Sequence, residues 1–114
     1  MLREFRSTHF TVIIGDQSYS VAGEIHHAKK LAIFRSRGED QQLAYSVYHV
    51  PSDMTVRSFS DIGLAKDFAT TAAAELDWSF TLPERRPAPE TLDRIYAGVM
   101  RRREELRRQN EANR

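Results

Sequence analysis

Residues 43–76 read LAYSVYHVPSDMTVRSFSDIGLAKDFATTAAAEL, and along this stretch the spacing of the apolar residues changes from two to about 3.6. Alternation over residues 43–50 is typical of a β-strand with one covered face. The residues that share the inward face of this strand are Leu43, Tyr45, Val47 and His49. Pro51 ends the strand because proline has no N–H to donate.

The second half of the same stretch predicts a helix. Ser60 is expected to cap it through its hydroxyl, and Asp61 places a carboxylate near the positive end of the helix dipole. The apolar side, at 100° per residue, consists of Leu64, Ala65, Phe68, Ala69, Ala72 and Leu76. The side expected to face water consists of Lys66, Asp67, Thr70 and Thr71. The alanines would let the helix approach a sheet closely.

Upstream residues predict the remaining strands. Residues 8–14 are β-branched and aromatic at period two, and residues 18–23 resume this pattern after a turn at Gly15. Residues 30–37 and 43–50 predict a second hairpin, and residues 54–59 a further short strand. The sequence therefore predicts an α+β fold: an antiparallel β-meander of about four to six strands with one helix packed on a face.

The chain beyond this helix has three expected parts. Trp78, Phe80 and Leu82 alternate with polar residues, which predicts a last strand or an extended arm. Residues 83–89 (PERRPAP) predict an extended proline-rich linker. A separate amphipathic, arginine-rich helix then begins near residue 90, and its apolar stripe consists of Leu92, Ile95, Tyr96 and Val99. The predicted organisation is thus a core domain (1–82), a linker (83–89) and a helix with a charged tail (90–114).

Composition narrows the function classes. The chain has 114 residues, a net charge of +1 and no cysteine, so it has no disulfide framework and no thiolate metal site. Residues 84–114 carry nine arginines against six acids, a net charge of +3, and residues 1–83 carry −2. No segment is apolar enough for a membrane span or a signal peptide, so a cytoplasmic location is the expectation.

Two groups of residues contain the residue types of catalytic or metal sites. Glu24, His26 and His27 lie together, but neighbouring strand residues point to opposite faces and cannot easily share an ion, so a solvated loop is expected. His49 lies near Tyr45, Tyr48, Ser52 and Asp53, which include triad residue types without any nucleophile elbow. We therefore predict no catalytic residue, no metal site and no cofactor.

The densest basic cluster lies on the C-terminal helix. Its members are Arg101, Arg102, Arg103, Arg107 and Arg108. Arginine forks match phosphate oxygens, so this cluster could bind nucleic acid. Glu104 and Glu105 interrupt the run at pairing distances of three and four residues, which favours a solvated or self-associating helix.

A second basic patch is predicted on the central hairpin. It consists of Lys29, Lys30, Arg35 and Arg37, with Phe34 among them. Basic residues beside an aromatic ring are typical of single-strand binders. Glu39 and Asp40 follow directly, and charged residues on a strand also prevent edge-to-edge pairing.

Three functions remain open at this point. The first is a non-enzymatic interaction or regulatory protein, self-associating or bound to a protein partner through Leu92, Ile95, Tyr96 and Val99. That stripe is too apolar to stay in water, so it docks either on its own domain or on another chain, and we favour a partner. The second is a nucleic-acid-binding accessory protein that uses the two basic clusters. The third is an enzyme or ligand binder at His49, Tyr45 and Tyr48.

Overall fold

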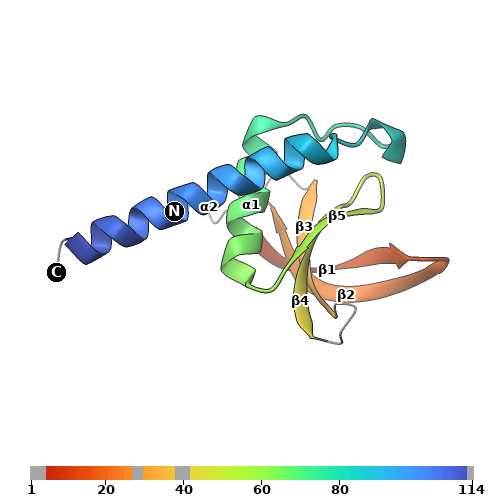
Figure 1. Ribbon diagram of the computed structural model, residues 1–114. Coiled ribbons are helices and arrows are strands. Elements are labelled where there is room, and N and C mark those ends of the chain that lie inside the picture. The colour runs from red at the N-terminus through yellow and green to blue at the C-terminus, as the bar shows by residue number, and fades with distance from the viewer. Residues whose placement is uncertain (1–4, 27–29, 38–41, 113–114) are drawn as a thin grey trace.

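The computed structural model describes residues 5–26, 30–37 and 42–112 and has the α+β architecture that the sequence predicts (Figure 1). Within these ranges the chain forms five strands, two α-helices and one 3₁₀ turn. Their bounds are β1 Phe5–Ile14, β2 Gln17–His26, β3 Leu31–Arg37, β4 Leu43–His49, β5 Met54–Phe59, α1 Ile62–Glu75, η1 Pro83–Arg85 and α2 Pro89–Ala112. Neither helix in this part of the chain has a stretch long and apolar enough to cross a bilayer.

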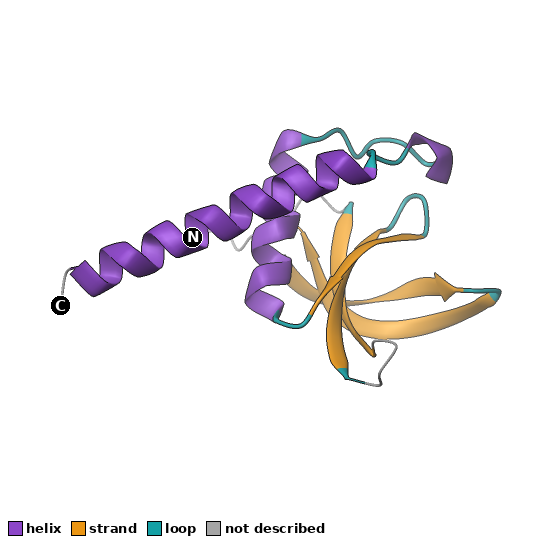
Figure 2. Cartoon of the chain, in the orientation of Figure 1, coloured by secondary structure: helices purple, strands orange, loops and turns teal. Residues whose placement is uncertain are grey.

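The strands form one antiparallel sheet in the order β1-β2-β3-β4-β5, which is the expected meander. Both expected hairpins are present, and β1 pairs with β2 along its whole length up to the turn at Gly15. In contrast, β2 pairs with β3 only over residues 23–25. The outer part of the β1–β2 hairpin therefore separates from β3 and curves out of the plane of the sheet, and its tip extends past the other strands (Figure 2).

Gly23 is the residue at which the β1–β2 hairpin separates from β3. A Cβ atom at this position would collide with the carbonyl oxygen of Ile33 and would lie 2.9 Å from the ring of Phe10. The chain can bring β2 this close to β3, and lay Phe10 over the same point, only because glycine has no side chain.

The helix α1 covers one face of the sheet, as expected from its alanine-rich side. Its buried residues are Ala65, Phe68, Ala69 and Ala72, and Leu64 and Leu76 are partly buried beside them. The expected cap at Ser60 is wrong by one residue. Asp61 has the extended backbone of an N-cap, and its carboxylate accepts a hydrogen bond from the Leu64 amide at 3.0 Å.

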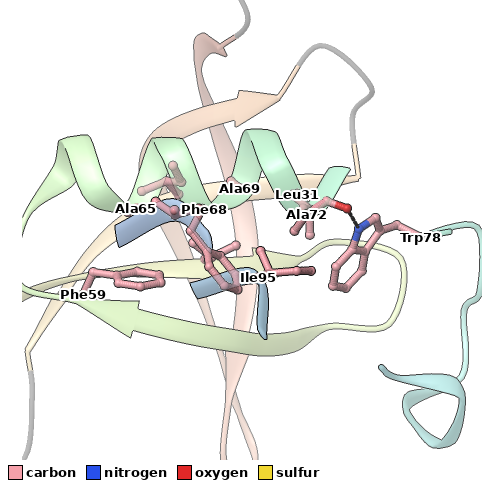
Figure 3. Packing of buried hydrophobic residues seen from close by; sticks show 11 residues of the cluster. Leu31, Phe59, Ala65, Phe68, Ala69, Ala72, Trp78 and Ile95 are labelled. Atoms are coloured by element: carbon pink, nitrogen blue, oxygen red, sulfur yellow. Dashed lines mark hydrogen bonds between the residues drawn. The ribbon is translucent and has the colours of Figure 1, made fainter. Parts of the chain in front are cut away.

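The main core lies between the sheet and both helices (Figure 3). Leu31, Ile33 and Val47 come from the centre of the sheet, and the ring of Phe59 lies 5.1 Å from that of Phe68. The indole N–H of Trp78 donates to the carbonyl of Ala72 at 2.8 Å, so a buried donor is satisfied at the last turn of α1.

The first half of α2 belongs to this same core. Ile95 and Val99 are each only 5% exposed, and Leu92 and Tyr96 pack against the cluster beside them. Of the two alternatives open for this stripe, the structure shows the one that the sequence did not favour: the stripe docks on its own domain. Arg57 of β5 fixes the contact, since it lies 2.9 Å from Asp93 and 4.7 Å from the Tyr96 ring centre.

The opposite face of the sheet has a smaller core of its own. Val12, Phe34 and Tyr48 are buried there, and Phe10, Val21 and Val50 pack around them. The curved β1–β2 hairpin covers this face, and the amide of Ile13 donates to the Tyr48 hydroxyl at 3.0 Å. The sheet therefore has apolar residues on both faces, which explains why Ile33 and Phe34 are adjacent and both buried.

Three local expectations differ from the structure. Residues 77–81 form no strand, so of the two predicted alternatives the extended arm is present. The linker is not extended throughout, because Arg85 and Arg86 donate to the carbonyls of Leu82 and Pro83 and close a 3₁₀ turn. Leu43 does not point into the core. It is 43% exposed, since it pairs with Arg37 at the far end of the β3–β4 ladder.

Candidate functional site

The five arginines predicted on α2 fall into two groups. Arg103, Arg107 and Arg108 are held in ion pairs. Arg101 and Arg102 are exposed and form no ion pair with any described residue. The second group is therefore available to bind a ligand or partner.

Arg107 and Arg108 form their ion pairs with glutamates of α2 itself. Arg107 donates to Glu104 and lies 3.8 Å from Glu111, and Arg108 lies 3.4 Å from Glu104. The hydrogen bonds from Arg107 lower the pKa of the Glu104 carboxyl. The expected pair of Glu104 with Arg108 is therefore present, but among the described residues neither Glu104 nor Glu105 pairs with Arg101.

The exposed arginines border a groove between the two helices. It has a volume of about 390 Å³, and its walls are Thr71, Glu75, Arg94, Ile95, Gly98, Val99, Arg101, Arg102 and Glu105. Ile95 and Val99 form an apolar floor, while three arginines and two glutamates form the rim. The groove thus joins an apolar surface to charges of both signs.

Helix geometry explains why these residues meet. Residues 94, 98, 101 and 105 follow one another at three- and four-residue intervals, and residue 102 lies four after 98, so they share one side of α2. Gly98 lies in the middle of this side, and a Cβ built on it would have no atom within 4 Å. The missing side chain leaves the groove open where α2 passes α1.

Sequence reasoning found part of this groove and missed the rest. It identified Ile95, Val99, Arg101 and Arg102, but not Arg94, Gly98 or the two residues that α1 contributes. Arg94 lies seven residues before Arg101, a spacing that could have linked the two. Nothing in the pattern of α1 indicates that Thr71 and Glu75 lie against α2, because that depends on how the helices cross.

The predicted basic patch on the central hairpin can be located for only two of its four side chains. Lys29 lies outside the described residues, and only the backbone of Arg37 is described. Lys30 and Arg35 lie near opposite ends of β3, about 16 Å apart at 3.3 Å per residue. Neither lines the groove between α1 and α2.

His49 is enclosed in the core side of the sheet. Its Nε2 lies 2.8 Å from the carbonyl oxygen of Trp78, which can only accept, so Nε2 carries the proton. Its Nδ1 then accepts from the Ser52 hydroxyl at 2.7 Å. The rings of Phe80 and Trp78 lie 4.3 and 5.3 Å away. Burial lowers the pKa of His49, and the hydrogen bond to Trp78 opposes this effect.

The residues that the sequence groups with His49 do not form one site with it. Tyr48 points to the opposite face, where burial raises the pKa of its hydroxyl and Asp53 accepts from it at 3.2 Å. Ser52 is 8% exposed and His49 is fully buried. The Ser52–His49 pair therefore ties the turn after β4 to the segment after α1 and does not present a nucleophile to solvent.

The histidine pair gives a further correction. His26 was expected in a solvated loop, but it ends β2 with 4% exposure, its ring edge-on to Phe5 at 5.4 Å. His27 lies outside the described residues. Among the described residues, no three His, Asp or Glu side chains lie close enough together to hold a metal ion.

Comparison with protein-family models found no family that matches the chain. Comparisons with curated proteins and with solved structures found no significant match either.

Proposed function

We propose that this protein is a non-enzymatic interaction module that binds a segment of a protein partner in the groove between α1 and α2. One observation carries the proposal: an apolar floor at Ile95 and Val99 lies open at Gly98, between exposed arginines that have no partner among the described residues. A small apolar floor with a polar rim is the usual composition of a protein-binding site. The C-terminal helix is still the proposed binding element, but the side that binds is the groove side, which lies next to the buried apolar stripe.

The charges of the rim favour protein over nucleic acid. Glu75 and Glu105 lie among the three arginines, so a phosphate backbone in this groove would meet carboxylates. Nucleic-acid surfaces instead gather one sign of charge along the path of the phosphates. A protein segment can place acidic side chains against arginines and basic ones against glutamates.

The geometry also suggests the chemistry of the partner segment. Arg94 and Arg101 lie two turns apart, about 10 Å along the axis at 1.5 Å per residue. A segment that carries two acidic side chains at this separation, with one apolar side chain between them, would pair with both arginines. The apolar side chain would then lie over Gly98.

Photocrosslinking tests this proposal in the intact protein. A benzophenone amino acid in place of Thr71, which lines the groove, should crosslink one protein segment in cells. The same amino acid in place of Ala74, which is exposed on α1 and does not line the groove, should not. Equal crosslinking at both positions would contradict the proposal.

A matched substitution then tests the groove itself. Gly98→Leu should fill it without a clash, because a Cβ there meets open space. A synthetic peptide of the crosslinked segment should bind the wild type at least about tenfold more tightly than this variant, a difference of about 1.4 kcal/mol. Unchanged peptide affinity would overturn the proposal.

Nucleic acid is the outcome that would replace this function. Tight binding of duplex DNA, with log K falling against log salt at a slope of about −2 to −3, would indicate two or three phosphate contacts. If Arg101→Gln with Arg102→Gln abolished that binding and Gly98→Leu did not, the groove would not be the site of action.

A further inference from the structure

The backbone of β1 carries unused hydrogen-bonding groups along its outer edge. The amide of Ile13 donates to the side chain of Tyr48, so it points away from β2. In an antiparallel pair, every second residue has this orientation. The amides of Ser7, His9 and Thr11 therefore also point outward, and none of them has a partner in any hydrogen bond between described residues.

This edge lacks the features that normally prevent strand pairing. β1 contains no proline and no lysine, and its one arginine, Arg6, lies near its beginning. Between residues 7 and 11 there is no acidic or permanently charged side chain. Natural proteins protect long edges with lysine, proline, bulges or a covering element. Of the two helices of the described chain, α1 reaches the base of the hairpin, where Lys66 lies 3.0 Å from Glu24 and 5.8 Å from the Phe5 ring centre. The rest of the hairpin extends away from both helices (Figure 1).

The tip of the same hairpin is apolar and exposed. Three large side chains gather there with exposures of 41%, 53% and 44%, namely Ile13, Ile14 and Tyr19. An exposed two-stranded ribbon is marginal by itself. Both the open edge and the apolar tip would be covered if another strand lay alongside β1.

We infer that two copies of this chain pair through their β1 strands, antiparallel and about a two-fold axis. His9 is the middle one of the three free amide positions, so the axis passes beside His9. Ser7 then pairs with Thr11 of the partner subunit, and all three amides are satisfied. The two sheets become one continuous sheet across the interface.

The charges of β1 are compatible with this arrangement. Around His9 the register places Arg6 opposite Val12 of the partner subunit, so the two arginines do not face each other. The ladder stops short of Ile13, whose outward amide already donates to Tyr48, and the beginning of the partner subunit's β1 then lies next to the exposed tip. A second copy fits because an isologous contact needs one surface that is complementary to itself. This inference is independent of the groove between the helices.

A pair of proline variants tests which edge is used. Thr11 and Ser20 face each other across the β1–β2 hairpin, and both amides point away from it. Proline at either position therefore removes no hydrogen bond of the hairpin, but Thr11→Pro blocks the β1 edge and Ser20→Pro does not. By sedimentation equilibrium we expect a dimer for the wild type and Ser20→Pro, and a monomer for Thr11→Pro. A monomeric wild type, or dimeric Thr11→Pro, would overturn the inference.

A charge-swap experiment locates the axis and does not depend on how proline is tolerated. His9→Lys and His9→Glu should each be monomeric, because like charges then oppose each other across the axis. Mixed in equal amounts, they should form a heterodimer. Ala22, which pairs with His9 across the hairpin on the same face, gives the control: Ala22→Lys and Ala22→Glu should each stay dimeric. If the mixture of His9 variants stays monomeric, β1 pairing about His9 is wrong.

Discussion

Arg103 on α2 donates a hydrogen bond to Asp67 on α1 at 2.7 Å, beyond the point where the apolar stripe of α2 ends. The same guanidinium reaches Asp61, the N-cap of α1, at 3.3 Å. Residues that the sequence placed on a solvated side of α1 and on a free helix thus hold the two helices together. Leu106, one turn further on, is 53% exposed.

Removal of the distal half of α2 should have a small effect on stability. Within the described part of the chain, deletion of residues 101–114 removes two ion pairs to the rest of the protein, both made by Arg103, and exposed pairs contribute about 0.2–1 kcal/mol. Arg103→Gln in the full chain should cost the same amount. Urea denaturation followed by Trp78 fluorescence measures both. A deletion that costs several kcal/mol more than Arg103→Gln would show that Leu106 or the other arginines are packed.

Phe68→Ala should lower the free energy of unfolding by about 3–5 kcal/mol, the usual range for a large aromatic side chain in a core. Phe68 is fully buried and its ring contacts Phe59. Thr70→Ala is the control: Thr70 is a partly buried polar residue two positions after Phe68 on the same helix. A loss below about 1 kcal/mol for Phe68→Ala would contradict the packing of α1 on the sheet.

Two glycine substitutions should change stability in opposite directions. Gly23→Ala places a methyl group against the Ile33 carbonyl and the Phe10 ring, and such overpacking costs about 1–3 kcal/mol. Gly98→Ala meets open space in the middle of α2 and should stabilise the protein by up to about 1 kcal/mol through helix propensity. Thermal melts of both variants give the comparison. A neutral Gly23→Ala would mean that β2 can move away from β3 freely.

Stability should fall in mild acid because of His49. Its pKa is lower in the folded state than the ordinary value near 6.5, so the unfolded chain binds more protons between these two values. The contribution is therefore complete above about pH 6.5 and is lost as the pH falls toward the folded pKa. His49→Gln keeps a donor for Trp78 and an acceptor for Ser52 but does not titrate. The difference between wild type and variant should narrow or reverse from pH 8 to pH 5, and a constant difference would refute the assignment.

The sequence predicted those elements of the fold whose structure depends on a few neighbouring residues. The alanine-rich side of α1 and the Gly15 turn could be read directly, because each follows from side-chain spacing or backbone preference over a few residues. The stripe of α2 could be identified but not its partner. An apolar face has the same pattern whether it meets its own domain or another chain.

The candidate groove was less accessible to sequence reasoning for a related reason. Arg101 and Arg102 were identified by their density, yet Arg103, their neighbour, is engaged by Asp67, which is 36 residues away. Which arginine is free depends on how α2 crosses α1. The crossing is determined by packing at Ile95 and Val99, and no residue near the arginines encodes it.

The long helix α2 also determines how the molecule tumbles in solution. The chain measures 50 × 34 × 28 Å along its principal axes, and the distal turns of α2 extend beyond the sheet (Figure 1). Rotational diffusion of such a shape is anisotropic. Backbone amides in α2 lie nearly parallel to the helix axis, so in NMR relaxation their ratio of transverse to longitudinal rates should exceed that of the β4 amides. A variant without residues 101–114 should tumble as a rounder body, and that contrast should shrink.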